Sequence, residues 1–214
     1  MMGYDSKKLS QDEPWRIFHI MSEFVYGFEA LSSVGPAVSV FGSARAKTSD
    51  PYYRLAEKTG KLFSKAGFAV ITGGGSGIME AVNKGASETG GKSIGLNIII
   101  PHEQETNRYV NMELKFRYFF CRKVMFLRYA SGFVFLPGGY GTMDELFESL
   151  TLIQNHREAA FPVVMIGRSY WKGLLDWFKG SVLGAGCIDK KDLNMIKLVD
   201  DPKEAVAIIK KGKK

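Results

Sequence analysis

A glycine turn and a carboxylate stand close together between Pro137 and Glu145, in the segment Pro-Gly-Gly-Tyr-Gly-Thr-Met-Asp-Glu. An apolar, strand-like run ends just before this segment, and a helix-like run begins just after it. Gly138, Gly139 and Gly141 have no Cβ atoms that would keep a ligand away from the backbone, and the free N–H groups of a first helical turn attract anions. We therefore predict a phosphate site here, with Glu145 beside it as a carboxylate able to do chemistry.

The same spacing also fits a purely structural role. Thr142 and Glu145 match a capping box, in which the glutamate side chain accepts a hydrogen bond from the backbone N–H of the cap residue. Without further information, the residues favour this structural interpretation of Glu145. The segment by itself leaves both the structural and the catalytic role open.

A second glycine loop, 73–77, follows a strand-like run and precedes the expected helix 78–87. It does not complete a dinucleotide-binding fingerprint, because Ile78 stands where the third glycine belongs. The end of the next strand, 97–101, also lacks the acidic residue that would hold a ribose hydroxyl of NAD. Neither glycine loop contains the Gly-Lys-Ser/Thr of a P-loop, so a nucleoside triphosphate bound in that manner is disfavoured as well.

Strand-like and helix-like runs alternate along almost the whole chain, which is typical of a parallel sheet with helices on its faces. We predict an α/β protein with a central parallel sheet of about seven strands and helices on both faces. With 214 residues, of which 45% are hydrophobic, the chain is expected to form one domain over residues 1–214. The expected strands are 38–42, 68–72, 93–100, 114–119, 133–136, 163–167 and 195–199.

Two helices have well-marked starts, because Asp50 precedes Pro51 and Asp201 precedes Pro202, each an N-cap residue before a proline at the first helical position. An added amphipathic helix is predicted ahead of the first strand, at about 14–31. Its apolar face could pack on the sheet of its own chain or form part of an oligomer interface, and the sequence leaves both possibilities open.

Ligands of an open α/β sheet bind beyond the C-terminal ends of its strands. Four glycine-rich or polar segments are expected at that edge, namely 42–45, 73–77, 97–102 and 137–145. Because all four share one edge of the sheet, we predict that they build a single site.

Composition excludes several other classes of protein. The chain has no stretch of about 18 apolar residues and no apolar segment within its first 14 residues, so we expect no membrane span, no secretory signal and a soluble, cytoplasmic protein. Two cysteines far apart and three scattered histidines argue against a metal site or a disulfide. The formal net charge of +7 owes much to the C-terminal lysines, so nucleic-acid binding is disfavoured. Those lysines are Lys203, Lys210, Lys211, Lys213 and Lys214.

Three segments together resemble the LONELY GUY (LOG) family, whose older label is "lysine decarboxylase-like". They are 73–81 (Gly-Gly-Gly-Ser-Gly-Ile-Met-Glu-Ala), the pair Arg122-Lys123, and 137–145. The resemblance extends from about Val38 to about Lys210, and the predicted N-terminal helix is similar to that of some bacterial members. It implies a modified Rossmann fold, no cofactor, and at least a dimer. Nothing in the sequence argues for pyridoxal phosphate.

The activity implied by the resemblance is that of a phosphoribohydrolase, which cuts the N-glycosidic bond of a nucleoside 5′-monophosphate to free base and ribose 5-phosphate. The substrate class is AMP or N6-modified AMP, such as a cytokinin nucleotide. Bond cleavage builds positive charge on the ribose and negative charge on the leaving base, so a carboxylate and a cation are suitable groups. Glu145 and Arg122 match the family's catalytic glutamate and arginine. From the residues alone, Arg122 could equally be a surface or ion-paired arginine on the expected helix 121–129.

The expected substrate-binding residues are Ser43, Gly74, Gly75, Ser76, Glu80, Asn97, Lys123, Met125, Gly138, Gly139, Gly141 and Thr142. Gly139, Gly141 and Thr142 are assigned to the 5′-phosphate, and the loop around Gly75 to the opposite wall. For Glu80 the alternative is a favourable charge at a helix start, and for Met125 it is ordinary core packing.

Two other functions remain open at this point. A carrier of a nucleotide or of molybdenum cofactor would use the same phosphate-binding edge without hydrolysis, and a sensor protein would bind nucleotide tightly without turnover. The aromatic helix 116–129 is a candidate oligomer interface, with core packing as the alternative.

Overall fold

Seven parallel strands form one sheet in the order β4-β3-β2-β1-β5-β6-β7. The computed structural model describes the backbone of residues 6–99, 105–155 and 161–212, with side chains from Trp15 onward within those ranges. The strands are β1 (Ala37–Phe41), β2 (Ala69–Thr72), β3 (Ser93–Ile98), β4 (Met112–Phe116), β5 (Ala130–Phe135), β6 (Val163–Ile166) and β7 (Ile196–Val199). Every neighbouring pair is parallel. The predicted α/β class and seven-stranded sheet are therefore confirmed.

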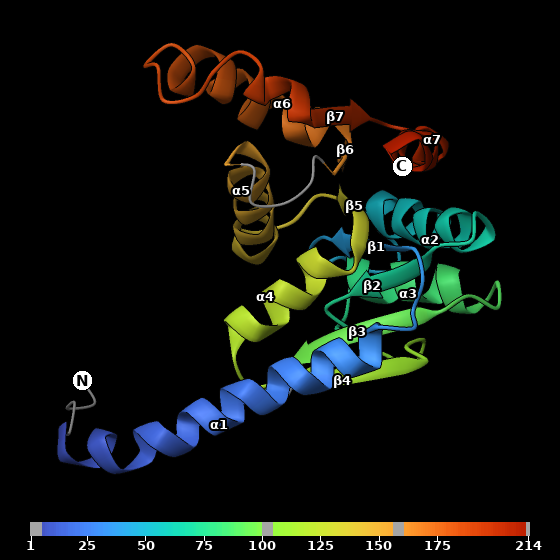
Figure 1. The fold of residues 1–214 in the computed structure, drawn as a ribbon. Coiled ribbons are helices and arrows are strands. Elements are labelled where there is room, and N and C mark those ends of the chain that lie inside the picture. The colour runs from blue at the N-terminus through green and yellow to red at the C-terminus, as the bar shows by residue number, and fades with distance from the viewer. Residues whose placement is uncertain (1–5, 100–104, 156–160, 213–214) are drawn as a thin grey trace.

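Helices cover both faces of this sheet (Figure 1). The helices are α1 (Ser6–Leu31), α2 (Pro51–Lys65), α3 (Ile78–Ser87), α4 (Phe119–Arg128), α5 (Tyr140–Gln154), α6 (Arg168–Trp177) and α7 (Pro202–Gly212). Side chains of α1, α4, α5 and α6 share one apolar core with one face of the sheet, and α2, α3 and α7 share a second core with the other face. The apolar strands are buried on both sides, as expected for a parallel sheet.

The two predicted proline-marked helix starts are confirmed. Asp50 is the N-cap of α2, and its carboxylate accepts a hydrogen bond of 2.8 Å from the backbone N–H of Tyr52. Asp201 accepts a similar bond of 3.1 Å from the backbone N–H of Lys203 at the start of α7. In each case the carboxylate satisfies an N–H group that has no partner within the helix.

Strand β4 ends at Phe116, earlier than the predicted 119, for a tertiary reason. The backbone N–H groups of Arg117 and Tyr118 donate to the Glu23 carboxylate of α1, at 2.8 and 3.3 Å. These groups therefore do not continue the sheet ladder, and the chain turns into α4 instead. The predicted end of β3 at Ile100 lies outside the described residues.

Helix α1 is longer than predicted, and its N-terminal part projects beyond the sheet in Figure 1. Its inner side packs on α4, where a Cβ on Gly27 would lie 2.7 Å from side-chain atoms of Met125. Its outer side leaves Ile17, Phe18 and Met21 more than half exposed. The helix thus packs on its own chain, as one interpretation expects, and it also presents an apolar face to solvent, which leaves an oligomer interface open.

Within the described ranges, none of the helices has both the length and the apolar character needed to cross a membrane.

Candidate active site

A cleft of about 1150 Å³ opens at the C-terminal ends of β1 and β5. The strand order reverses between these two neighbouring strands. From β1 the chain adds β2, β3 and β4 on one side, and from β5 it adds β6 and β7 on the other. Such switch points are where open α/β sheets bind ligands. The backbone N–H of Ser43, just past β1, donates to the carbonyl oxygen of Pro137, just past β5, at 3.0 Å. The two loops are therefore tied together at the floor of the cleft.

The N-terminus of α5 forms one wall of this cleft. Gly139 is the N-cap and α5 begins at Tyr140. The N–H groups of Thr142 and Met143 both donate to the carbonyl oxygen of Gly139 at 3.0 Å, which leaves the N–H groups of Tyr140 and Gly141 as the donors of the first turn. A Cβ on either Gly139 or Gly141 would meet no atom of the described residues within 4 Å, so a ligand can approach the backbone there.

The capping-box interpretation of Glu145 is wrong, because Gly139 and not Thr142 caps the helix. Glu145 lies in the second turn of α5, lines the cleft, and has a side chain only 8% exposed. Burial raises the pKa of Glu145 to about 7, although the positive charges of Lys123 and Arg122 act to lower it. A carboxyl group with a pKa near neutrality can exchange a proton under physiological conditions.

Arg122 reaches the same cleft from α4. Its guanidinium carbon lies 5.3 Å from the ring centre of Phe119 and 5.7 Å from that of Phe126. Burial lowers the pKa of Arg122, but an arginine remains protonated in proteins. Its buried Nε makes no hydrogen bond to any described residue. Since a buried donor without an acceptor is costly, this group is suited to bind an anionic or polar ligand.

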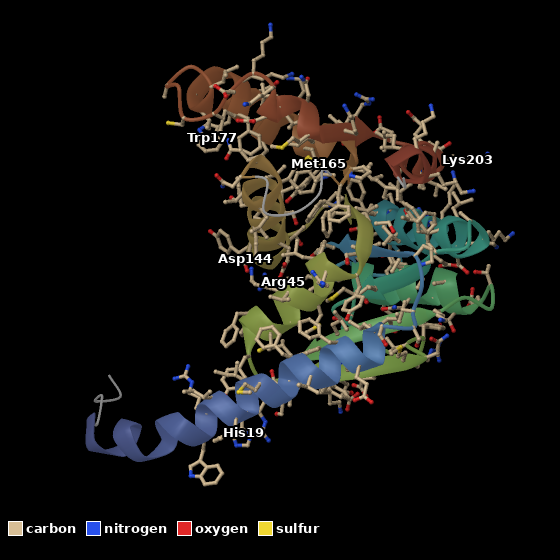
Figure 2. The ribbon with its side chains drawn as sticks, in the orientation of Figure 1. His19, Arg45, Asp144, Met165, Trp177 and Lys203 are labelled. Atoms are coloured by element: carbon tan, nitrogen blue, oxygen red, sulfur yellow. The ribbon has the colours of Figure 1, made fainter. Side chains whose placement is uncertain are left out.

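Lys123, predicted to bind substrate, is not among the residues that line the cleft. Its ammonium group lies 2.8 Å from a carboxylate oxygen of Asp144, 2.6 Å from one of Glu148 and 3.8 Å from one of Glu145. Figure 2 shows Asp144 at the end of α5 beside α4. Lys123 therefore contacts the carboxylates of α5 and is absent from the residues that line the cleft.

The loop 73–77 supports the cleft more than it lines it. Only Gly73 of this loop lies on the cleft surface. Ser76 donates from its hydroxyl to the carbonyl oxygen of Ala44 at 2.9 Å, and Asn107 donates to the carbonyl oxygens of Gly74 and Gly75 at 3.0 Å each. Gly74, Gly75 and Ser76 thus make hydrogen bonds that fix the loop, and they do not line the cleft.

Three other predicted residues also lie off the cleft surface. Met125 is fully buried in the core, which agrees with the alternative of ordinary packing. Asn97 donates to Glu113 at 3.0 Å and to Thr106, and so joins β3 to β4. Glu80 lies in the first turn of α3, where its charge acts on Tyr53 of α2.

The cleft thus brings together seven of the predicted residues: Ser43, Arg122, Gly138, Gly139, Gly141, Thr142 and Glu145. His102, at the end of the predicted 97–102 segment, lies outside the described residues.

Several lining residues were not predicted. Met79, Ile98 and Phe119 give the cleft an apolar wall near Arg122. Phe119 lies three residues before Arg122 on α4 and therefore on the same face of the helix, so this spacing could have indicated that Phe119 also lines the cleft. Tyr170 donates from its hydroxyl to the carbonyl oxygen of Gly138 at 2.6 Å, but it belongs to α6, a helix that is not among those expected from the sequence.

The fold and cleft define a Rossmann-type α/β protein with a helix N-terminus at its switch point. The chain belongs to the family described as possible lysine decarboxylase, whose model matches residues 79–209, more than half of the chain. Its relatives include phosphoribohydrolases of the LOG family, which confirms the predicted resemblance.

Several relatives carry the name of an activity, of which two are described here. The chain is 26% identical over 168 residues to the cytokinin riboside 5′-monophosphate phosphoribohydrolase of Mycobacterium tuberculosis, which covers 76% of this chain and 88% of that protein. It is 34% identical over 116 residues to the cytokinin riboside 5′-monophosphate phosphoribohydrolase LOG of Oryza sativa subsp. japonica, which covers 53% of this chain and 47% of that protein.

Among solved structures, the molybdenum cofactor carrier protein MCP of Chlamydomonas reinhardtii matches with a TM-score of 0.63 at 24% identity. The match covers 83% of this chain and 97% of that one. This likeness shows the fold.

Proposed function

We propose that this chain is a phosphoribohydrolase that cleaves the N-glycosidic bond of a nucleoside 5′-monophosphate, AMP or an N6-modified AMP such as a cytokinin nucleotide. The products are the free base and ribose 5-phosphate. The observation that carries the proposal is a buried carboxyl group, Glu145, with a pKa near neutrality in the same cleft as a buried arginine and an open helix N-terminus. The names of the relatives point to the same reaction.

The 5′-phosphate is assigned to the first turn of α5. The N–H groups of Tyr140 and Gly141 and the hydroxyl of Thr142 are the available donors, and the positive end of the helix dipole favours an anion there. The segment is held by Tyr170 and Ser43, which bond to the carbonyl oxygens of Gly138 and Pro137. The phosphate would thus anchor the nucleotide within one helical turn of Glu145.

Glu145 is assigned the role of general base. A water molecule attacks C1′ of the ribose and transfers a proton to the Glu145 carboxylate, while the C1′–N bond breaks and its electron pair leaves with the base. The departing base takes up a proton from solvent, and Glu145 releases to solvent the proton that it accepted, which restores the carboxylate and balances the reaction. In its ionised form, the carboxylate also stabilises the positive charge that develops on the ribose before the new C–O bond is complete.

Arg122 is assigned to the nucleotide on the other side of the cleft. Its guanidinium, near the rings of Phe119 and Phe126, carries a donor that has no partner among the described residues. It can hold the nucleotide or stabilise the negative charge that develops on the departing base. Met79 and Ile98 add apolar surface on which the face of a base can rest.

The direct test is release of free base. The protein is incubated with AMP, GMP, CMP and N6-isopentenyl-AMP, and the free base is followed by chromatography. We expect adenine or its N6-modified form to appear together with ribose 5-phosphate. If none of the four nucleotides releases its base, the proposed activity is wrong.

A second candidate is a non-catalytic carrier of nucleotide or molybdenum cofactor, because such a carrier shares this fold. A buried carboxylate beside a phosphate site repels an anionic ligand, so Glu145 gives no advantage to a protein that only binds. Tight binding of a nucleotide or pterin phosphate with no base release from any nucleotide would favour the carrier.

A further inference from the structure

One ammonium group lies among three carboxylates at the contact between α4 and α5. Lys123 Nζ is 2.6 Å from Glu148, 2.8 Å from Asp144 and 3.8 Å from Glu145. Its side chain is 15% exposed, whereas those of Asp144 and Glu148 are 60% and 32% exposed. The lysine is therefore held in place by two partly exposed carboxylates, and the third carboxylate within its reach is the buried one.

Adjacent residues of α4 face in different directions, because successive side chains of a helix point about 100° apart. Arg122 lines the cleft, and Lys123 faces α5. Arg122 and Lys123 were both expected at the site. Of the two, Arg122 can touch a nucleotide, whereas Lys123 contacts Glu145.

We propose that Lys123 is a positioning residue, which acts on the reaction through Glu145 by keeping its carboxylate ionised. The inference rests on the proposed function of Glu145. The lysine is not assigned to the substrate, because its ammonium group is paired with Asp144 and Glu148 and Lys123 is not among the residues that line the cleft.

The charges around Glu145 act in opposite directions. Lys123 and Arg122 from α4 lower the pKa of Glu145, while burial and the negative charges of Glu148 and Asp144 on α5 raise it. Arg45 and Asp50, in the segment that follows β1, also line the cleft. Removal of Lys123 and removal of Glu148 should therefore change the protonation of Glu145 in opposite directions, which a role in packing alone does not predict.

The test uses the full chain with Lys123→Met, Lys123→Arg and Glu148→Gln. Base release from AMP is measured from pH 5 to pH 9, and the titration of the Glu145 carboxyl group is followed by 13C NMR, with its signal assigned from its loss in Glu145→Gln. The matched control is Lys172→Met, which removes a lysine paired with Asp176 on the exposed surface of α6.

For Lys123→Met we expect the acidic limb of the pH profile and the Glu145 titration to move to higher pH by about one pH unit, the lower end of what one nearby opposite charge does. Glu148→Gln should move both to lower pH. Lys123→Arg retains the positive charge and should remain near the wild type, as should Lys172→Met.

The proposal is overturned if Lys123→Met lowers base release equally at every pH, or if the Glu145 titration is the same in all variants. Glu148→Gln and Lys123→Arg keep the test informative should Lys123→Met fail to fold. If the wild-type protein releases no base, the proposed function fails, and the NMR titration alone still decides whether Lys123 controls the charge of Glu145.

Discussion

The backbone N–H of Ser43 donates to the carbonyl oxygen of Pro137 at 3.0 Å, and this bond joins the ends of β1 and β5 where the strand order reverses. The two loops that flank the cleft are thereby fixed relative to each other by main-chain atoms. Gly138 follows directly, and a Cβ there would lie 2.1 Å from the hydroxyl oxygen of Thr142 and 2.9 Å from the Ser43 nitrogen. The donors assigned to the phosphate therefore depend on the absence of a side chain at this position.

Gly138→Ala should lower the melting temperature and weaken AMP binding together, because the added methyl group displaces Thr142 and the Ser43 to Pro137 bond. Thermal unfolding and calorimetric titration with AMP measure the two effects. Gly173→Ala is the matched control, since this helical position in α6 is exposed and a Cβ there meets no described atom within 4 Å. It should raise stability by about 0.5–1 kcal/mol and leave binding unchanged. Unchanged AMP binding in Gly138→Ala would contradict this account of the loop.

Glu145→Gln should lower base release by about 10²–10⁴-fold, because the amide cannot accept the proton of the attacking water. Arg122→Ala should lower it by about 10²–10³-fold through the loss of a charge-stabilising donor. Both are measured with AMP as substrate after circular dichroism has shown that the variants are folded. Glu204→Gln, on the exposed start of α7, is the control and should be fully active. If both site variants retain wild-type rates while folded, the proposed mechanism is wrong.

Base release by the wild-type protein should fall as the pH drops below about 7, because the general base must be ionised and burial raises the pKa of Glu145 to about 7. Well below that value, the rate should drop about tenfold for each pH unit, in proportion to the ionised fraction of a single group. The measurement is kcat/KM for AMP between pH 5 and pH 9. A rate that is constant down to pH 5 would show that Glu145 is ionised throughout this range or is not required.

Glu145→Gln should be more stable than the wild type, and increasingly so as the pH rises. The folded protein holds the Glu145 proton up to about pH 7, whereas the unfolded chain releases it near the ordinary value of 4.5. The contribution of the bound proton to the free energy of unfolding is therefore fully present below pH 4.5 and is lost as the pH rises through 7. At pH 8 the difference should be on the order of 3 kcal/mol in the free energy of unfolding. Urea denaturation at pH 5 and pH 8 measures it, and an equal difference at the two pH values would contradict the burial of an ionisable carboxyl group.

Self-association is expected from the outer face of α1, where Ile17, Phe18, Met21 and Val25 are each more than half exposed. An apolar face of this kind typically marks an interaction site, and at least a dimer is proposed. Light scattering should give a multiple of the chain mass of 23.8 kDa for the wild type and a lower mass for Met21→Glu. His19→Glu places the same charge on an exposed residue two positions earlier, which faces another side of the helix, and should not change the mass. A monomeric wild type would refute the expectation of a dimer, and an unchanged mass in Met21→Glu would exclude this face.

The strands were predictable because a parallel sheet buries both of its faces, so each strand is a short apolar run that interrupts the helical pattern. Strand β5 and its glycine turn follow this rule closely. Helix α6 was not predicted, since most of its large side chains, such as Tyr170 and Trp177, remain partly exposed, and among its residues only Trp171 is buried. The end of β4 was misplaced because it depends on Glu23, a residue far away in the chain.

The sequence by itself determined the α/β class, the seven strands, the glycine turn after β5 and the two candidate catalytic residues, because these properties are local or belong to a linear motif. Only the tertiary structure decided which side chains meet. It excluded the capping box by starting α5 at Tyr140, placed Met125 in the core, and separated Arg122 from its neighbour Lys123. The structure was needed for this because Glu145 is buried and surrounded by charged side chains of α4 as well as of its own helix, α5. A linear sequence pattern contains no information on how two helices face each other.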